Sequence, residues 1–377
     1  MIGKLSFLEA RGRINVQFFM KILVLIVCAV AFEIFTSGVF LSPRNITLLL
    51  RQTAINGVLA AGMVFVIVSG NIDLSIGSGV ALAGAVLAIL QAWHGWSTAS
   101  AVLLVMGLGL LMGIFNGFWV IKGVPAFVVT LGSMLLLRGL ALIVTKGISI
   151  APLNVSTKMI GQGFISRIPS MIILIAIFIS YAILWVFKKN TKKKTPGRKQ
   201  SLAGIVLPGI FVLGMIYVVY GYKGIPIPVV IMALVIIIMW FVGQHTVFGR
   251  YVYAIGGNAE ASELSGINVK RTTFIVFVIM GVLTALGGIL LSARIDGAMP
   301  TMGYFMELDA IAAAFIGGCS MTGGVGTVLG ALFGALFMAT LDNGMSLMNI
   351  SSFIQYVVKG IIIILAVFSD ISARGKG

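Results

Sequence analysis

The chain has 377 residues, of which 59% are hydrophobic and only 10% are charged, with a mean hydropathy of +1.13. A soluble domain carries about 25% charged residues, so this chain has too little polar surface to cover itself in water, and it is too hydrophobic for intrinsic disorder. The formal net charge of +16 does not indicate a nucleic-acid-binding protein, because so few residues are charged. The composition predicts a protein that lies in a lipid bilayer.

The sequence offers no metal site and no recognisable hydrolytic chemistry. Cys28 and Cys319 both lie in apolar runs, and His94 and His245 have no partner at the spacing of metal ligands. The motifs of a phosphate-binding loop, a nucleophile elbow and an H-E-x-x-H zinc site are missing. We therefore expect no catalytic residue, metal or cofactor in this chain, and any energy source must be ion coupling or another subunit.

Apolar runs long enough to cross a membrane recur along the whole chain. A bilayer core about 30 Å thick needs about 20 such residues per helix, and the first run follows a basic segment without a convincing cleavage site, which favours a retained helix. Most of the 26 basic residues then fall on the side of the N-terminus, so we expect both termini in the cytoplasm. The sequence predicts one all-α polytopic domain, residues 1–377, with about twelve spans at 18–40, 54–69, 73–92, 98–121, 125–145, 169–187, 203–221, 226–243, 273–293, 306–319, 324–345 and 352–369.

Ionisable residues are rare within these runs, and such residues are functional candidates by default because charge is costly in lipid. No relay of acids in mid-span is evident, which argues against a proton- or sodium-coupled carrier. Three of the acids instead stand near span ends beside glycines. The ionisable residues in question are Glu33, Asp73, Arg138, Glu307, Asp309, Asp342 and Lys359.

The segment SGNIDLSIGS, residues 69–78, is the sharpest local feature. Asn71, Asp73 and Ser75 are good residues to cap a helix N-terminus, and the flanking glycines allow a tight reversal. One helix should end here and another begin inside the protein, as a gate or as a self-satisfied structural cap.

Glycines and hydroxyls recur between Phe315 and Gly326, before another apolar helix, which suggests an internal repeat. Arg138-Gly139 and Lys359-Gly360 give a second correspondence, but at a different offset along the chain. Two series of glycines at every fourth residue predict close packing between helices. They are Gly109, Gly113 and Gly117, and Gly326, Gly330 and Gly334.

The loop at 244–272 encodes one short surface helix. Asn258 is a natural residue to cap its N-terminus, the residues from Ala259 to Leu264 favour helix, and Gly266 suits the position after a helix end. Such a short helix cannot bury itself, so it must lie on the membrane or dock into another protein.

Four segments together resemble one protein family. GRYVYAIGGNAEASELSGINVKR (249–271), LDAIAAAFIGG (308–318), SGNIDLSIGS and VPAFVVTLGSMLLLRG resemble permease subunits of bacterial ABC sugar importers of the ribose, xylose and galactose type. The resemblance covers roughly 45–150 and 225–370. It implies a subunit of the bacterial cytoplasmic membrane that dimerises, receives sugar from an extracytoplasmic binding protein, and is driven by ATP-binding cassette subunits that hold ATP and Mg.

The resemblance also makes the short cytoplasmic helix the coupling helix, which sits in a groove of the ATPase. Its residues are Asn258, Glu260, Ala261, Glu263, Leu264 and Gly266, with Glu260 and Leu264 as the expected main contacts. Residues 165–224, two apolar runs around a basic loop, depart from the smaller members of the family. They look like a helical hairpin inserted into a ten-helix core, as in the xylose or multiple-monosaccharide branch, so we expect a pentose or hexose as substrate.

A path for a neutral sugar should be lined by hydroxyls, amides and a few aromatic rings. The alternatives are a related importer for branched-chain amino acids or nucleosides, and an ion-coupled secondary carrier that works alone. The candidates for the path or gate are Asn71, Asp73, Ser75, Asn116, Phe127, Thr130 and Ser320.

Overall fold

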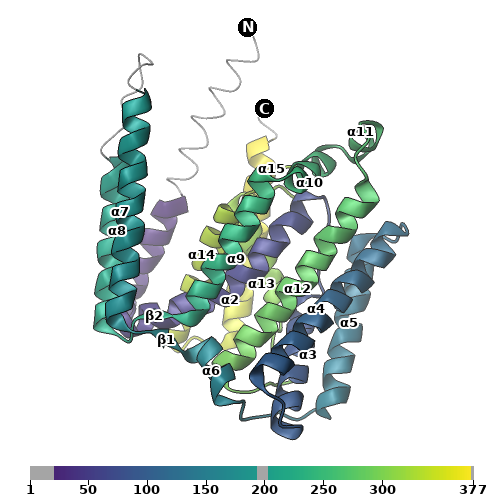
Figure 1. The fold of residues 1–377 in the computed structure, drawn as a ribbon, viewed down its shortest axis with the longest axis horizontal. Coiled ribbons are helices and arrows are strands. Elements are labelled where there is room, and N and C mark those ends of the chain that lie inside the picture. The colour runs from purple at the N-terminus through teal and green to yellow at the C-terminus, as the bar shows by residue number, and fades with distance from the viewer. Residues whose placement is uncertain (1–20, 193–202, 375–377) are drawn as a thin grey trace.

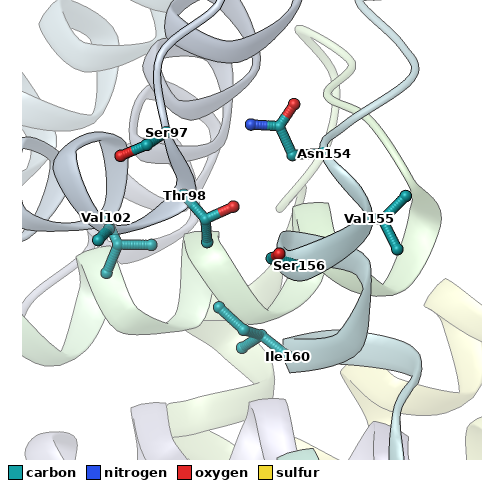
Figure 2. A pocket seen from close by; sticks show the side chains of 8 residues that line it. Ser97, Thr98, Val102, Asn154, Val155, Ser156 and Ile160 are labelled. Carbon is teal, nitrogen blue, oxygen red and sulfur yellow. The ribbon is translucent and has the colours of Figure 1, made fainter.

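The computed structural model describes residues 21–192 and 203–374, and nearly all of their regular structure is helical (Figure 1). Helical residues 21–35 come first. The elements that follow are α2 (Pro43–Val68), α3 (Ile76–Ala88) continuing as the π-helix η1 (Ile89–Trp93), α4 (Thr98–Ile121), α5 (Ala126–Thr145), α6 (Val155–Gln162), β1 (Phe164–Ile165), α7 (Arg167–Lys192), α8 (Ala203–Gly221), β2 (Ile225–Pro226), α9 (Ile227–His245), α10 (Val247–Gly257), α11 (Ala259–Leu264), α12 (Val269–Ile295), α13 (Met306–Gly317), α14 (Val328–Leu347) and α15 (Ser352–Arg374).

Seven helices among the described residues are long and apolar enough to cross a membrane, and α7, α8 and α15 add shorter apolar stretches. The polytopic all-α fold is thereby confirmed. Each predicted span contains helix, although residues 18–20 of the first lie outside the described part of the chain. The seven long helices are α2, α3 with η1, α4, α5, α9, α12 and α14.

Two of the predicted spans differ clearly from the helices that form there. α2 begins at Pro43, well before residue 54, because Ser42 caps it and proline suits a first helical turn, so the helix continues through Arg44 and Arg51. α13 has only 12 residues, which at 1.5 Å per residue cover about 18 Å. It is a half-helix and does not cross the bilayer core alone.

Figure 1 shows α10 and α11 at one end of the bundle and α6, β1 and β2 at the opposite end. We call these the α11 end and the α6 end. The hairpin of α7 and α8 stands beside the bundle, and the antiparallel pair of β1 and β2 closes its base, with Ile165 opposite Ile225. The basic run that begins at Lys188 lies partly outside the described residues.

Small residues let the central helices approach closely. Gly109 and Gly113 of α4 lie against Gly281 of α12, and any side chain at these positions would overlap the opposite backbone. The first glycine series is thus confirmed as a packing surface. In the second series Gly330 and Gly334 face α13, but Gly326 precedes α14, whose N-cap is Thr327.

The order of the elements reveals a repeat with inverted halves. The helices α2 to α5 and α12 to α15 follow one another in the same pattern of lengths and breaks, displaced by about 230 residues. α2 and α12 run antiparallel, since Leu59 packs at Gly287 while Gly62 packs at Leu283. Arg138 lies in α5 and Lys359 lies in α15, and these two helices hold equivalent positions in the repeat. The break at 69–75 instead pairs with residues 296–305, before α13, and not with 315–326.

Candidate functional site

The break between α2 and α3 forms where the glycines predict it, although Ser75, the N-cap residue of α3, makes no capping hydrogen bond with its side chain. α2 ends at Val68, and Gly70 follows with φ +79°, a left-handed conformation that glycine adopts without strain. Asn71 Nδ2 donates to the Ser69 carbonyl oxygen at 3.2 Å and to Ser69 Oγ at 3.0 Å. The chain then runs without helix to Ile76, where α3 begins.

A chain of buried hydrogen bonds joins this break to α4 and α5. Asp73 Oδ1 accepts from the Ser75 backbone N–H at 2.8 Å and from Ser75 Oγ at 2.6 Å. Asn116 Nδ2 donates to Ser75 Oγ at 2.9 Å, and Ser133 Oγ donates to Asn116 Oδ1 at 2.5 Å. All four side chains are buried. This network pairs its polar groups with one another and fixes the start of α3 against two neighbouring helices.

α3 and α13 begin next to each other in the middle of the bundle. Gly79 packs against Thr284, which lies near the middle of α12, so α3 starts at mid-depth. Gly77 lies against the Gly303 carbonyl oxygen and the Glu307 carboxylate. A carboxylate is favourable there, because the first turn of a helix has unpaired N–H groups and carries positive partial charge.

Of the remaining predicted path residues, Thr130 lies beside that network, whereas Phe127 and Ser320 lie apart from it. Thr130 is buried, and its hydroxyl lies 2.9 Å from the Ala126 carbonyl oxygen and 3.3 Å from that of Ile72. Phe127 points outward from α5 and is exposed. Ser320 is buried in the loop 318–327, where its hydroxyl lies 2.8 Å from Thr322 Oγ1. The structure therefore brings Asn71, Asp73, Ser75, Asn116 and Thr130 to one region, with Phe127 and Ser320 elsewhere.

Three of the intramembrane charges form a triad that sequence reasoning did not join. Lys359 Nζ of α15 lies 3.0 Å from Asp309 of α13 and 2.9 Å from Asp342 of α14. The triad links the last three helices. Its signal in the sequence was the rarity of such charges, but nothing local indicated which lysine would meet which acid.

At the α11 end the short helix forms as predicted, from Ala259 to Leu264. Asn258 Oδ1 accepts from the Ala261 backbone N–H at 2.9 Å, and Gly266 follows with φ +86°. Leu264 is 85% exposed, more than any other large hydrophobic side chain in the described residues. Glu260 and Glu263 are also exposed, and Glu260 lies in the first turn of the helix. α11 thus presents an apolar side chain flanked by carboxylates.

α10 connects this exposed helix to the break after α2. Gly256 packs directly on the Val68 carbonyl oxygen and on Gly324, leaving no room for a side chain. The Gly324 backbone N–H donates to the same Val68 oxygen at 2.9 Å. Tyr253 Oη donates to the Gly326 carbonyl oxygen at 2.8 Å. Sequence reasoning missed Tyr253 and Gly256, because their partners are distant in the chain.

A helical membrane bundle with helices interrupted at mid-depth and an exposed short helix at one end is typical of a transport protein. A family model described as "Branched-chain amino acid transport system / permease component" matches residues 45–367. The chain belongs to this family of permeases.

Curated relatives match almost the whole chain. The xylose transport system permease protein XylH of Escherichia coli K12 is 43% identical over 369 residues, which cover 96% of this chain and 94% of the relative. The Haemophilus influenzae protein of the same name is 42% identical over 96% of this chain and 98% of its own length. The ribose import permease protein RbsC of Bacillus subtilis is 37% identical over 88% of this chain and 86% of its own length. No solved structure matches the chain.

Proposed function

We propose that this chain is the membrane-spanning permease subunit of an ATP-driven importer, which moves xylose or a related pentose or hexose across the bacterial cytoplasmic membrane by alternating access. The observation that carries the proposal is the end-to-end similarity to xylose permeases, joined to the exposed helix α11. The family description mentions branched-chain amino acids, but the relatives with the matching length are sugar permeases.

We assign α11 as the coupling helix that docks into a groove of an ATP-binding cassette subunit, with Leu264 and Glu260 as the principal contacts. Leu264 supplies an apolar anchor that water covers in the isolated subunit, and the adjoining acids suit a basic rim. ATP and Mg belong to the cassette subunit in this scheme, and the permease itself carries no cofactor and no catalytic residue.

Movement of α11 would reach the membrane interior through α10. Gly256 abuts the end of α2, and Tyr253 holds the loop before α14. A shift of α10 would displace the break that contains Asn71 and, beyond it, the hydrogen-bonded Asp73, Ser75 and Asn116 with Thr130 beside them. We assign these residues, together with Ser320 in the loop, to the gate. Phe127, exposed on α5, remains a candidate for the path wall.

This assignment also sets the sidedness and the remaining partners. The α11 end faces the cytoplasm, with both chain termini on that side. The α6 end faces outward, where an extracytoplasmic sugar-binding protein delivers substrate. A second copy of the permease completes the path, and α7 with α8 form the hairpin inserted at 165–224.

Reconstitution into proteoliposomes tests the proposal. The permease, its cassette subunit and its binding protein together should take up radiolabelled xylose only when ATP is present on the side that the cassette subunit faces. Ribose, glucose and leucine are added as competitors, and the degree to which each inhibits xylose uptake measures the substrate specificity. Uptake by this chain alone, driven by a proton or sodium gradient, would contradict the proposal, as would ATP-driven uptake of leucine with no uptake of any sugar.

A further inference from the structure

The chain between α12 and α13 returns from the α6 end to mid-depth without forming a helix. The Ala298 and Ile150 backbones pair near the α6 end, whereas the Gly303 carbonyl oxygen reaches Gly77 at the start of α3. Parts of this segment are exposed, including Met299 and Tyr304. Lipid cannot satisfy non-helical backbone, which occurs at membrane depth only where protein covers it or where it lines a water-filled cavity. This face of the subunit is therefore not a lipid face.

Three aromatic side chains gather on that same face. Tyr304 is 52% exposed, and its ring centroid lies 6.0 Å from that of Phe305. The Phe305 ring makes an edge contact with Tyr356 of α15 at 4.9 Å. Phe305 has φ +62°, a left-handed conformation that a bulky residue adopts only at a cost, and such strain is concentrated at functional positions.

A charged side chain adjoins the aromatic group. The Arg138 guanidinium lies over the Tyr304 ring, 4.3 Å from its centroid. Its Nη1 donates to the Pro300 carbonyl oxygen at 2.7 Å and to that of Met302 at 2.9 Å. Arg138 thus holds the non-helical segment in place and presents a cation beside exposed rings, which lipid would not accommodate.

We propose that Tyr304, Phe305 and Tyr356, with Arg138 beside them, form the surface that the sugar contacts as it crosses the middle of the membrane. Aromatic rings cover the C–H face of a monosaccharide, and the guanidinium and the tyrosine hydroxyls hydrogen-bond its hydroxyl groups. Mid-depth junctions of inverted repeats are where transporters place such sites. The buried network around Asp73 bonds within itself and positions the helices instead.

This inference rests on the proposed function and adds a site to it. Cysteine labelling tests the site without requiring transport. In a background with Cys28→Ser and Cys319→Ala, Tyr304→Cys and Tyr356→Cys should react with a membrane-impermeant thiosulfonate in the assembled complex, and xylose with its binding protein should slow the reaction. Tyr217→Cys, at an exposed tyrosine on the peripheral helix α8, is the matched control and should not react. Tyr304→Cys that is inert in the complex would overturn the inference, whether lipid or the second copy covers it.

Transport supplies the second measurement. Tyr304→Ala and Tyr356→Ala should lower ATP-driven xylose uptake about tenfold, while Tyr304→Phe, which keeps the ring and loses only the hydroxyl, should lower it much less. Assembly with the cassette subunit and its ATPase activity should not change. Full uptake by both alanine variants overturns the site while leaving the proposed function intact. A wild-type complex that imports no sugar defeats the proposed function instead, and the labelling result then still reports whether this face lines a water-filled path.

Discussion

Two adjacent glycines at the end of α10 have very different surroundings. Gly256 meets the Val68 carbonyl oxygen and Gly324, whereas a side chain on Gly257 would meet no described atom within 4 Å beyond its chain neighbours and its own helix backbone. The contact at Gly256 is where the α11 end touches the break after α2. Its geometry depends on the lack of a side chain, so a substitution at Gly256 tests the transmission that we propose.

Gly256→Ala should therefore separate α10 from α2. We expect a loss of about 1–3 kcal/mol in stability, as for an overpacked interior, and a larger loss of ATP-driven transport. Thermal unfolding of the purified subunit and uptake by the reconstituted complex measure the two effects. Gly257→Ala is the matched control and should behave as wild type. Equal behaviour of both variants in transport would show that the contact does not transmit movement.

Lys359 supplies the only cation that the described residues place against Asp309 and Asp342. Removing one partner of a buried ionic cluster leaves charge uncompensated, which costs about 3–5 kcal/mol, whereas replacing the whole cluster can be nearly neutral. Lys359→Met should thus strongly destabilise the contact of α15 with α13 and α14. Adding Asp309→Asn and Asp342→Asn should restore most of the stability, measured as the unfolding temperature in detergent. A triple variant no more stable than the single one would refute this account.

At the scale of elements, α11 forms from local signals alone. Asn258 caps it and Gly266 ends it, and both effects act within one helical turn, which is why the sequence predicts its bounds. Leu264 stays exposed to solvent in the described part of the chain. An isolated helix of this length is not stable by itself, so we expect docking to the proposed cassette subunit to stabilise it further.

Leu264→Asp should abolish association with the cassette subunit and leave membrane insertion unchanged, because it replaces an apolar anchor with a solvated charge. Co-purification from detergent measures association. Val155→Asp, at a comparably exposed apolar position at the α6 end, is the control and should retain the cassette subunit. Normal co-purification of the Leu264 variant with the cassette subunit would contradict the assignment of α11 as the coupling helix.

Elements that depend on distant contacts were harder to predict. The break at 69–75 was evident, because glycine and capping residues act locally. α13 looked like a full span, since an apolar run does not show that residues 296–305 return to mid-depth first. Their path is set by Arg138 on α5 and by Gly77 on α3, far away in the sequence. The aromatic surface at Tyr304 could not be predicted from the sequence for the same reason.

At the scale of the whole molecule, the inverted repeat explains why α3 and α13 begin side by side. α2 and α12 run antiparallel, each followed by a non-helical segment, so the starts of α3 and α13 meet near the middle of the bundle. Alternating access is commonly a rocking of such halves about the site between them. The hairpin of α7 and α8 lies outside this repeat, and Figure 1 shows it beside the bundle.

Because the hairpin is peripheral, the rest of the bundle should fold without it. Ile165 and Ile225 are paired across the two short strands, so the chain can be closed there by replacing residues 167–223 with Asn-Gly, a sequence suited to a tight hairpin turn. The shortened subunit loses the Ser170 hydroxyl that accepts from the Ile225 backbone N–H at 3.0 Å, and the packing of Gly221 on Pro43. We expect a modestly lower unfolding temperature, with insertion, co-purification with the cassette subunit and xylose uptake all retained. Loss of co-purification or uptake in a subunit that still inserts would show that the hairpin belongs to the working core, through its contact with the first turn of α2.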